Sequence, residues 1–330
     1  MVNILGAGVA YPDVELSDGF LGELGLTPSG SDRLLLERFG VKTRRISLPL
    51  DYIESTRNEN AVEGRKFALT TPTVLGTQAA RCAMARAGIR PEQLGLIVAD
   101  TATPYQTCPS EAQRIGGALG LKVPAYDFVG GAETFPLFIE TIRNWKPERV
   151  PEFVLCVSTN TPSQHVNYSN DALAAYLFGD SASAVVISTR VGGKLKVLDS
   201  YLRRHGSKRT VFTLDRHVSC ARDQILPSEE VSQGMIQGIQ RLSENHALAL
   251  KEALVIGPQL FAGDSAACTN TLGISPEQTP SPTKSHGYAL GSSTGAALAE
   301  SWDLLKSSQQ VVILQAGDGM QSGSVMMASE

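Results

Sequence analysis

The sequence lacks the features that mark metal-binding, secreted and membrane proteins. Its five cysteines are scattered and odd in number, a pattern that favours reduced thiols over a disulfide framework or a zinc site. No uninterrupted apolar stretch approaches the length that spans a bilayer, and the first residues read as an apolar strand, not as a basic leader. A large excess of one charge is also missing, because the net charge is -4. We therefore expect a cytoplasmic protein with no metal, no nucleic-acid partner and no membrane association.

The composition is that of an ordinary globular chain that alternates strands with helices. Of its 330 residues, 42% are hydrophobic and 19% are charged, enough to bury a substantial core. Apolar runs bounded by Gly, Pro or Asp predict buried strands at 4–9, 94–99, 153–158, 182–187, 254–257, 311–314 and 325–327. Helical patterns cover 73–87, 110–119 and 231–250. This alternation predicts an α/β protein built of layers.

The chain also carries a coarse internal echo. A turn rich in Gly, Ser and Asp precedes a short strand near the close of each half, at 178–184 and at 317–323. The echo suggests two similar halves, which we place at 1–189 and 190–330. The loop 275–284, rich in Pro, Ser and Thr, reads as a connection between elements and not as a domain linker.

One stretch, residues 125–135, reads as a strand-to-helix turn of the kind that carries a nucleophile. It resembles the active-site segment of ketoacyl-acyl-carrier-protein synthase III, in the thiolase superfamily. There, a Cys stands five residues after an Asp and three before a Phe. Asp127 and Phe135 are those two anchors, and both place Ala132 at the nucleophile position. A methyl group cannot attack a thioester, so covalent acyl transfer from this side chain is excluded.

The resemblance to synthase III runs nearly end to end. The blocks that carry it, in the family's order, are 31–45, 95–99 with 109–112, 125–135, 178–184 and 286–293. It implies a thiolase-like fold of five αβαβα layers made of two similar halves, normally dimeric, with the nucleophile at a helix N-terminus. It also implies coenzyme A or phosphopantetheine thioesters as substrates, acyl carrier protein as a partner, and no tightly bound cofactor.

The two other catalytic positions of the family are also substituted. The His that normally opens a His-Gln-Ala-Asn run corresponds to Pro258, aligned by Gln259, and the Asn that follows a Gly corresponds to Tyr288. Proline brings no titratable group and no donor, so proton transfer from that position is lost. Tyr288 can still donate one hydrogen bond.

The resemblance also places several positions along the substrate channel. The aromatic residue that stacks on adenine corresponds to Leu34, the basic residue that helps to hold the carrier-protein arm corresponds to Gly263, and the phosphate-binding Arg is kept as Arg38. Binding of coenzyme A is therefore in question. The resemblance also aligns Cys108 with an aromatic residue that reaches the tunnel of the partner subunit, and Met320 with an aromatic residue near the acyl pocket. The last candidate is His286, for which we favour a packing role.

Some chemistry could survive the substitutions. The family's oxyanion hole uses backbone amides, which here belong to Ala132 and to Gly317 or Gly319, and backbone donors do not depend on side-chain identity. Glu133 could act as a base, although a helix-start carboxylate satisfied by backbone amides is the favoured interpretation. Thr134 is a weaker nucleophile candidate, because no His is placed by motif to activate it.

Three hypotheses follow for the function. The first is a non-catalytic partner subunit of an active ketosynthase or acyltransferase in fatty-acid or polyketide biosynthesis, forming a homo- or heterodimer with a synthase III-like subunit. The second is a noncanonical acyltransferase or thioesterase that uses the retained oxyanion hole. The third is a Cys-to-Ala trapped mutant of an active enzyme, which the further substitutions at Pro258 and Tyr288 disfavour.

Overall fold

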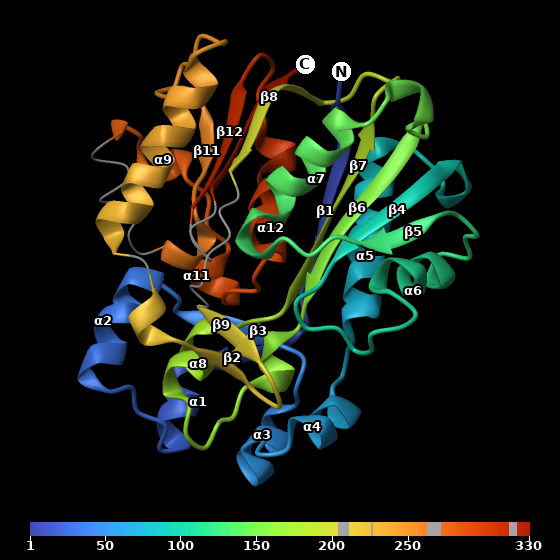
Figure 1. Cartoon of the computed structure of the whole chain (residues 1–330). Coiled ribbons are helices and arrows are strands. Elements are labelled where there is room, and N and C mark those ends of the chain that lie inside the picture. The colour runs from blue at the N-terminus through green and yellow to red at the C-terminus, as the bar shows by residue number, and fades with distance from the viewer. Residues whose placement is uncertain (204–210, 226, 263–271, 317–321) are drawn as a thin grey trace.

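Nine strands form one mixed sheet through the centre of the molecule. The computed structural model describes residues 1–203, 211–225, 227–262, 272–316 and 322–330 (Figure 1). In spatial order the strands are β11 (Leu254–Ile256), β12 (Gln310–Ala316), β13 (Ser322–Ser329), β8 (Leu195–Arg203), β1 (Asn3–Ala10), β7 (Ser181–Ser188), β6 (Phe153–Asn160), β4 (Leu94–Asp100) and β5 (Ala125–Asp127). All seven strands expected from the apolar runs are therefore present.

The sheet consists of two parts joined by a narrow seam. Strands β1, β7, β6, β4 and β5 come from the first half of the chain, and β8, β13, β12 and β11 from the second. In the described residues, the ladder between β1 and β8 pairs Asn3 with Lys196 and Ile4 with Leu195, and the N–H of Val197 donates to the carbonyl of Val2 at 2.9 Å just before it. The boundary proposed at residue 189 lies in the turn between β7 and β8.

Helices cover both parts of the sheet and fill the space between them. Helices α5 (Pro72–Ala87) and α6 (Glu111–Ala118) pack on one face of the first part, and α9 (Ser228–Ser243) packs on β12 and β13. Helices α7 (Thr134–Asn144) and α12 (Ser292–Ser301) lie in the middle, where one apolar core joins both parts of the sheet (Figure 1). The order is therefore helix, sheet, helix, sheet, helix, as in the expected five-layered α/β fold.

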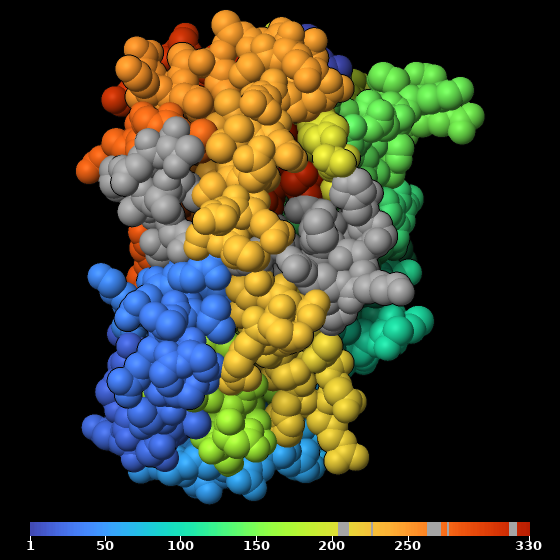
Figure 2. All heavy atoms as spheres, turned by 60° about the vertical axis from the view of Figure 1, so that its left-hand side comes forward, coloured from blue at the N-terminus to red at the C-terminus, as the bar shows by residue number. Residues whose placement is uncertain are grey.

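A cap of small elements covers the end of the layers where β7 begins. It contains two pairs of antiparallel strands, β2 (Val14–Ser17) with β3 (Thr43–Ile46) and β9 (Phe212–Leu214) with β10 (Val218–Cys220), and the helices α1 (Asp18–Glu23), α2 (Gly30–Phe39), α3 (Leu50–Thr56), α4 (Ala61–Phe67), α8 (Ala172–Leu177) and α11 (Thr283–His286). All of these elements except α4 and α11 contribute side chains to a second core. Figure 2 shows the segment around β9 and β10 beside the N-terminal segment, where Arg222 pairs with Asp32 of α2. Local sequence patterns did not predict this cap.

The expected helices are present, with one correction. Helix α5 begins at Pro72, one residue before the expected start, and Ser110 is the N-cap of α6. Helix α9, however, ends at Ser243 and not at Leu250. The apolar residues beyond its end, Leu248 and Leu250, pack on the same core from a non-helical segment. The apolar pattern therefore extends further along the sequence than the helix does.

The remaining short elements are 3-10 turns. They are η1 (Pro91–Gln93), η2 (Gly131–Glu133), η3 (Pro147–Arg149), η4 (Pro162–His165), η5 (Arg222–Gln224), η6 (Gln259–Phe261), η7 (Pro276–Gln278) and η8 (Trp302–Leu304). Two of them, η2 and η6, carry positions that the sequence singled out.

Candidate functional site

Ala132 lies in the turn that starts the central helix α7. The turn η2 opens with Gly131 at a φ of 62°, a conformation that glycine adopts without strain. The carbonyl of Gly131 then accepts the backbone N–H of Thr134 and, at 2.8 Å, its hydroxyl. Ala132 is 7% exposed and Glu133 is 1% exposed. A buried methyl group therefore occupies the head of a helix whose free amides favour an anion.

The first sequence anchor, Asp127, has a structural task. Its two carboxylate oxygens accept the backbone N–H groups of Glu111 and Ala112, both at 2.9 Å. The carboxylate thus satisfies two amides at the start of α6, fifteen residues earlier in the chain. This bond fixes the end of β5 against α6 and so fixes where the turn toward Ala132 begins.

A buried carboxylate that the motifs did not single out, Asp100, lies behind the same turn. It ends β4, is 1% exposed, and accepts the N–H of Gly130 at 3.0 Å and the hydroxyl of Ser158 at 2.7 Å. Burial raises its pKa, and the bonds from Ser158 and Gly130 oppose that rise. One sign in the sequence that Asp100 belongs to this site is its position directly after an apolar strand. An Asp at the end of a strand is common in α/β proteins, so the sign is not specific.

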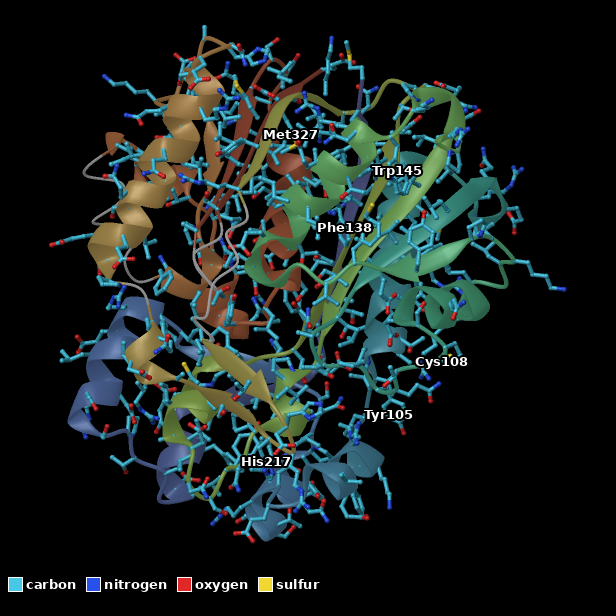
Figure 3. All side chains as sticks on the ribbon, viewed as in Figure 1. Tyr105, Cys108, Phe138, Trp145, His217 and Met327 are labelled. Carbon is cyan, nitrogen blue, oxygen red and sulfur yellow. The ribbon has the colours of Figure 1, made fainter. Side chains whose placement is uncertain are left out.

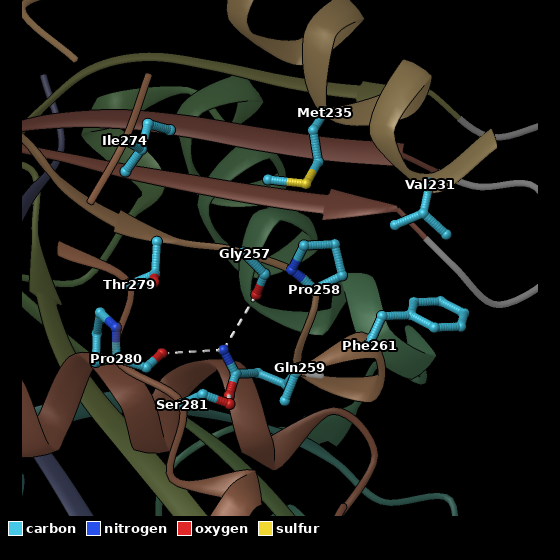
Figure 4. A pocket seen from close by; sticks show the side chains of 11 residues that line it. Val231, Met235, Gly257, Pro258, Gln259, Phe261, Ile274, Thr279, Pro280 and Ser281 are labelled. Atoms are coloured by element: carbon cyan, nitrogen blue, oxygen red, sulfur yellow. Dashed lines mark hydrogen bonds between the residues drawn. The ribbon is translucent and has the colours of Figure 1, made fainter. Parts of the chain in front are cut away.

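Pro258 lies between β11 and η6, on the wall of a cavity of about 30 Å³ (Figure 4). The neighbouring Gln259 donates to the carbonyl of Gly257 at 3.1 Å and to that of Pro280 at 3.4 Å (Figure 4). Its amide oxygen accepts the hydroxyl of Ser281 at 3.2 Å. The cavity is otherwise lined mostly by apolar side chains, among them Met235 of α9. Gln259 therefore has a structural role, and Pro258 contributes only apolar surface.

Tyr288 is 1% exposed and packs among aromatic rings of the cap. Its ring lies 6.3 Å from that of Phe178 and 5.9 Å from that of Phe212, measured between centroids. Its backbone pairs with the end of α8, where its N–H donates to the carbonyl of Leu177 at 2.9 Å. The large ring is thus held by the cap core.

The structure brings the segments that carry these positions together around the start of α12. A β-carbon added to Gly291 would lie 2.7 Å from the carbonyl oxygen of Gly131, so the segment after Tyr288 reaches the turn of Ala132. Helix α12 contacts both η2 and β11, the strand that leads into Pro258. Ala132, Pro258 and Tyr288 therefore belong to neighbouring elements, and their equivalence to the family's catalytic positions stays a prediction.

His286 lies elsewhere. Its ring stacks on Tyr11 with centroids 4.0 Å apart, and its Nδ1 lies 3.1 Å from the carbonyl oxygen of Pro282 and 4.0 Å from Glu300. Glu300 is near the end of α12 and Gly291 is at its start, about 14 Å apart along the helix axis. His286 is thus held at the end of α12 remote from Ala132, an environment that suits packing.

The channel positions are spread over the cap and the loop after β4. Leu34 is 66% exposed on α2, and the Arg38 guanidinium lies 5.1 Å from the ring centroid of Phe261 in η6. Cys108 is an exposed thiol on the loop between β4 and α6, near Tyr105 (Figure 3). Gly263, Gly317, Gly319 and Met320 lie outside the described residues. The oxyanion hole therefore stays a prediction.

The part of the chain that the structure describes lacks two further features. No group of three or more His, Cys, Asp or Glu side chains in those ranges has the arrangement of a metal site. Over the same residues, no helix has both the length and the apolar character needed to cross a bilayer.

Comparison with known proteins points to one family. A family profile described as 3-oxoacyl-[acyl-carrier-protein (ACP)] synthase III matches residues 127–206, which include Ala132. A β-ketoacyl-[acyl-carrier-protein] synthase III of Rhizorhabdus wittichii is 30% identical over 213 residues, 64% of this chain and 60% of that protein. The protein of the same description from Campylobacter jejuni strain RM1221 is 26% identical over 310 residues, 90% of this chain and 89% of its own length.

Solved structures resemble the whole chain. The 3-oxoacyl-[acyl-carrier-protein] synthase III of Aquifex aeolicus VF5 superposes with a TM-score of 0.82 at 24% identity, covering 99% of this chain and 100% of that one. A type III pentaketide synthase from Neurospora crassa gives 0.80 at 18% identity, with both chains fully covered. At these identities the likeness shows the fold, which is thiolase-like. With the profile and the relatives, it shows that this chain has a thiolase-like fold and is similar in sequence to ketoacyl-acyl-carrier-protein synthase III.

Proposed function

We propose that this chain is a non-catalytic partner subunit of an active ketosynthase or acyltransferase in fatty-acid or polyketide biosynthesis. The observation that carries the proposal is the buried methyl group of Ala132 at the head of α7. Pro258 and Tyr288, at the other two catalytic positions, are both built into packed surroundings. A substitution made only to trap a substrate would leave those two positions unchanged.

The first experiment is intact-protein mass spectrometry of the purified chain after exposure to acetyl-CoA and longer acyl-CoA thioesters. We expect no acyl adduct under denaturing conditions, because no thiol stands at position 132. A synthase III with its Cys intact is the positive control for loading. An adduct that maps to residues 125–144 of this chain would contradict the proposal.

The same sample under native conditions tests the partner role. Co-expression with an active synthase III-like protein should give a heterodimer, because subunits of one family offer matching interfaces. Malonyl-dependent condensation should then depend on the partner's Cys and not on this chain. Recovery of this chain only as a homodimer beside an active homologue would count against the proposal.

Restoring the nucleophile separates loss of function from a trapped enzyme. In Ala132→Cys we expect no measurable condensation with malonyl-acyl-carrier-protein, because Pro258 cannot transfer a proton and Tyr288 replaces the carboxamide. The control is Cys108→Ala in the same background, which removes the exposed thiol that could be mistaken for the new one. Condensation by Ala132→Cys would favour the trapped-enzyme hypothesis.

A second candidate function rests on Glu133, a buried carboxylate next to Ala132. It would serve a noncanonical acyltransferase or thioesterase in which Glu133 acts as general base toward water or an acceptor alcohol. The substrate would be a coenzyme A or phosphopantetheine thioester. Turnover of acyl-CoA that Glu133→Gln abolishes, with unchanged thermal stability, would support this function over the first.

A further inference from the structure

The turn before α7 is held from behind by Asp100. Its Oδ1 accepts the backbone N–H of Gly130, two residues before Ala132, at 3.0 Å. Its Oδ2 accepts the hydroxyl of Ser158 on β6 at 2.7 Å. The side chain of Asn160 also donates to the carboxylate, while the hydroxyl of Thr134 donates to the carbonyl of Gly131. Burial raises the pKa of Asp100, and its donors oppose that rise because they favour the ionised carboxylate.

The packing leaves this carboxylate little freedom. A β-carbon at Gly291 would come within 2.6 Å of both Asp100 Oδ2 and Thr134 Oγ1 and within 2.7 Å of the carbonyl oxygen of Gly131. The backbone of Gly291 therefore closes over the carboxylate and the turn at once. Asp100 is 1% exposed, so water does not screen its charge.

The other charged groups nearby do not neutralise this charge. Within the described residues, no Lys, Arg or His forms an ion pair with Asp100. Three titratable side chains near it, Glu133 in the turn, Asp127 on the neighbouring strand β5 and Cys156 on β6, are not cations. The remaining side chains on this side of α7 are hydroxyls and apolar groups, which line a cavity of about 10 Å³, room for one water molecule at most.

We propose that Asp100 is a positioning residue that fixes the turn before α7 and, as a buried anion behind Ala132, makes the head of this helix unfavourable for a second negative charge. A condensing enzyme needs that helix head to stabilise a thiolate and then an oxyanion. Here one amide of the turn, that of Gly130, is already committed to an internal carboxylate. The head of α7 is thus suited to a neutral thioester carbonyl and not to the charged intermediates of condensation.

This inference goes beyond the proposed function and does not depend on whether a partner subunit exists. It predicts that replacing Ala132 with Cys does not by itself restore a readily ionised thiol. A Cys at position 132 should keep its proton to a higher pH than an ordinary thiol, because a like charge close by disfavours the thiolate.

The test is alkylation of Ala132→Cys by iodoacetamide from pH 6 to 10, with the modified peptide followed by mass spectrometry so that the native thiols do not interfere. We expect a midpoint above the ordinary thiol value of about 8.5. In Ala132→Cys with Asp100→Asn the midpoint should fall by about one pH unit. At pH 7 the alkylation rate should rise about threefold, because a tenfold gain in thiolate is partly offset by its lower nucleophilicity.

Asp303→Asn is the matched control, since it removes one carboxylate that pairs with Arg86 in an exposed position. It should leave the midpoint unchanged. Asp100→Thr keeps an acceptor for the Gly130 N–H without a charge, and should act like Asp100→Asn if the latter folds poorly. Equal midpoints with and without the Asp100 carboxylate would overturn the proposal. So would a midpoint below about 8.5 in Ala132→Cys alone, which needs no change at Asp100.

Discussion

At the scale of single residues, buried carboxylates hold distant segments of this chain together by accepting their hydrogen bonds. Asp180, directly before β7, is fully enclosed and accepts the backbone N–H groups of Ser47 and Ser163 at 2.7 and 2.9 Å. Both serine hydroxyls also donate to its Oδ2, each at 2.5 Å. It thereby ties β7 to the end of β3 and to η4. Burial nevertheless raises its pKa from 3.8 to about 6, against the effect of these four bonds.

This shift predicts how stability depends on pH. Between about pH 4 and pH 6 the folded chain keeps the Asp180 proton that the unfolded chain has released, so the contribution of Asp180 to stability falls as pH rises. The fall should total about 3 kcal/mol and should stop above about pH 7. Urea unfolding of the wild type and Asp180→Asn at pH 4, 5, 6, 7 and 8 measures it as the difference between their free energies of unfolding. A difference that is flat or rises from pH 4 to 6 would contradict the assignment.

Single residues also show which placements the sequence motifs could predict. The spacing from Asp127 and Phe135 placed Ala132 at the head of α7, and the structure has it there. The apolar run 153–158 predicted a buried strand, and Cys156 within it is 1% exposed. The bond from Gly130 to Asp100 joins residues thirty positions apart and follows from no local pattern.

At the scale of elements, helix α6 begins because a strand residue caps it. Asp127 satisfies the N–H groups of Glu111 and Ala112, while the hydroxyl of its own N-cap, Ser110, accepts the N–H of Gln113 at 3.3 Å. Three amides that the helix leaves unpaired thus have acceptors. The sequence pattern predicted a helix starting at residue 110, but it gave no sign of the capping role of Asp127.

We therefore expect Asp127→Ala to lower the free energy of unfolding by about 2 kcal/mol, because it removes both acceptors from the start of α6. Asp127→Asn keeps one acceptor and should cost about half as much. Chemical denaturation at pH 7 measures both. The comparison variant is Glu92→Ala, a 73% exposed side chain in η1, for which a change within about 0.5 kcal/mol is expected. Equal losses in Asp127→Ala and Glu92→Ala would show that the cap contributes nothing.

Element boundaries were predicted where a local signal exists and missed where packing decides. Gly88, at a φ of 68°, ends α5. A glycine that directly follows a helical pattern predicts such an end. Helix α9 lacks such a signal at Ser243, and the apolar stripe continued past its end. The strands of the cap, β2, β3, β9 and β10, are short and only partly apolar, so the core they share with α1 and α8 became visible only in the folded chain.

At the scale of the whole molecule, each half of the chain packs one central helix on strands of the other half. Helix α12, from the second half, packs on β1 and β7, and α7, from the first half, packs on β8 and β13. Each central helix therefore covers apolar surface of the other half. Neither part of the sheet can lose its central helices without exposing the shared core.

This packing of α7 and α12 on the opposite halves predicts a single cooperative unfolding transition. The two tryptophans report on the two halves, since Trp145 follows α7 and Trp302 follows α12 (Figure 3 labels Trp145). In Trp302→Phe and Trp145→Phe, the fluorescence of the remaining indole should change at the same urea concentration as the far-ultraviolet circular dichroism of that variant. Two separate midpoints in either variant would show that residues 1–189 and 190–330 unfold independently.

The sequence by itself determined the α/β class of the fold and the places of its main strands, because apolar periodicity is a local property. The order of the layers was implied by the resemblance to a known family, and the catalytic deficit at Ala132, Pro258 and Tyr288 stays a prediction from the same source. Only the tertiary structure decided that Asp100 lies behind Ala132, that Gly291 closes over it, and that His286 lies at the remote end of α12. Those placements depend on which distant segments meet when the two halves pack, and burial then gives each charge its effect.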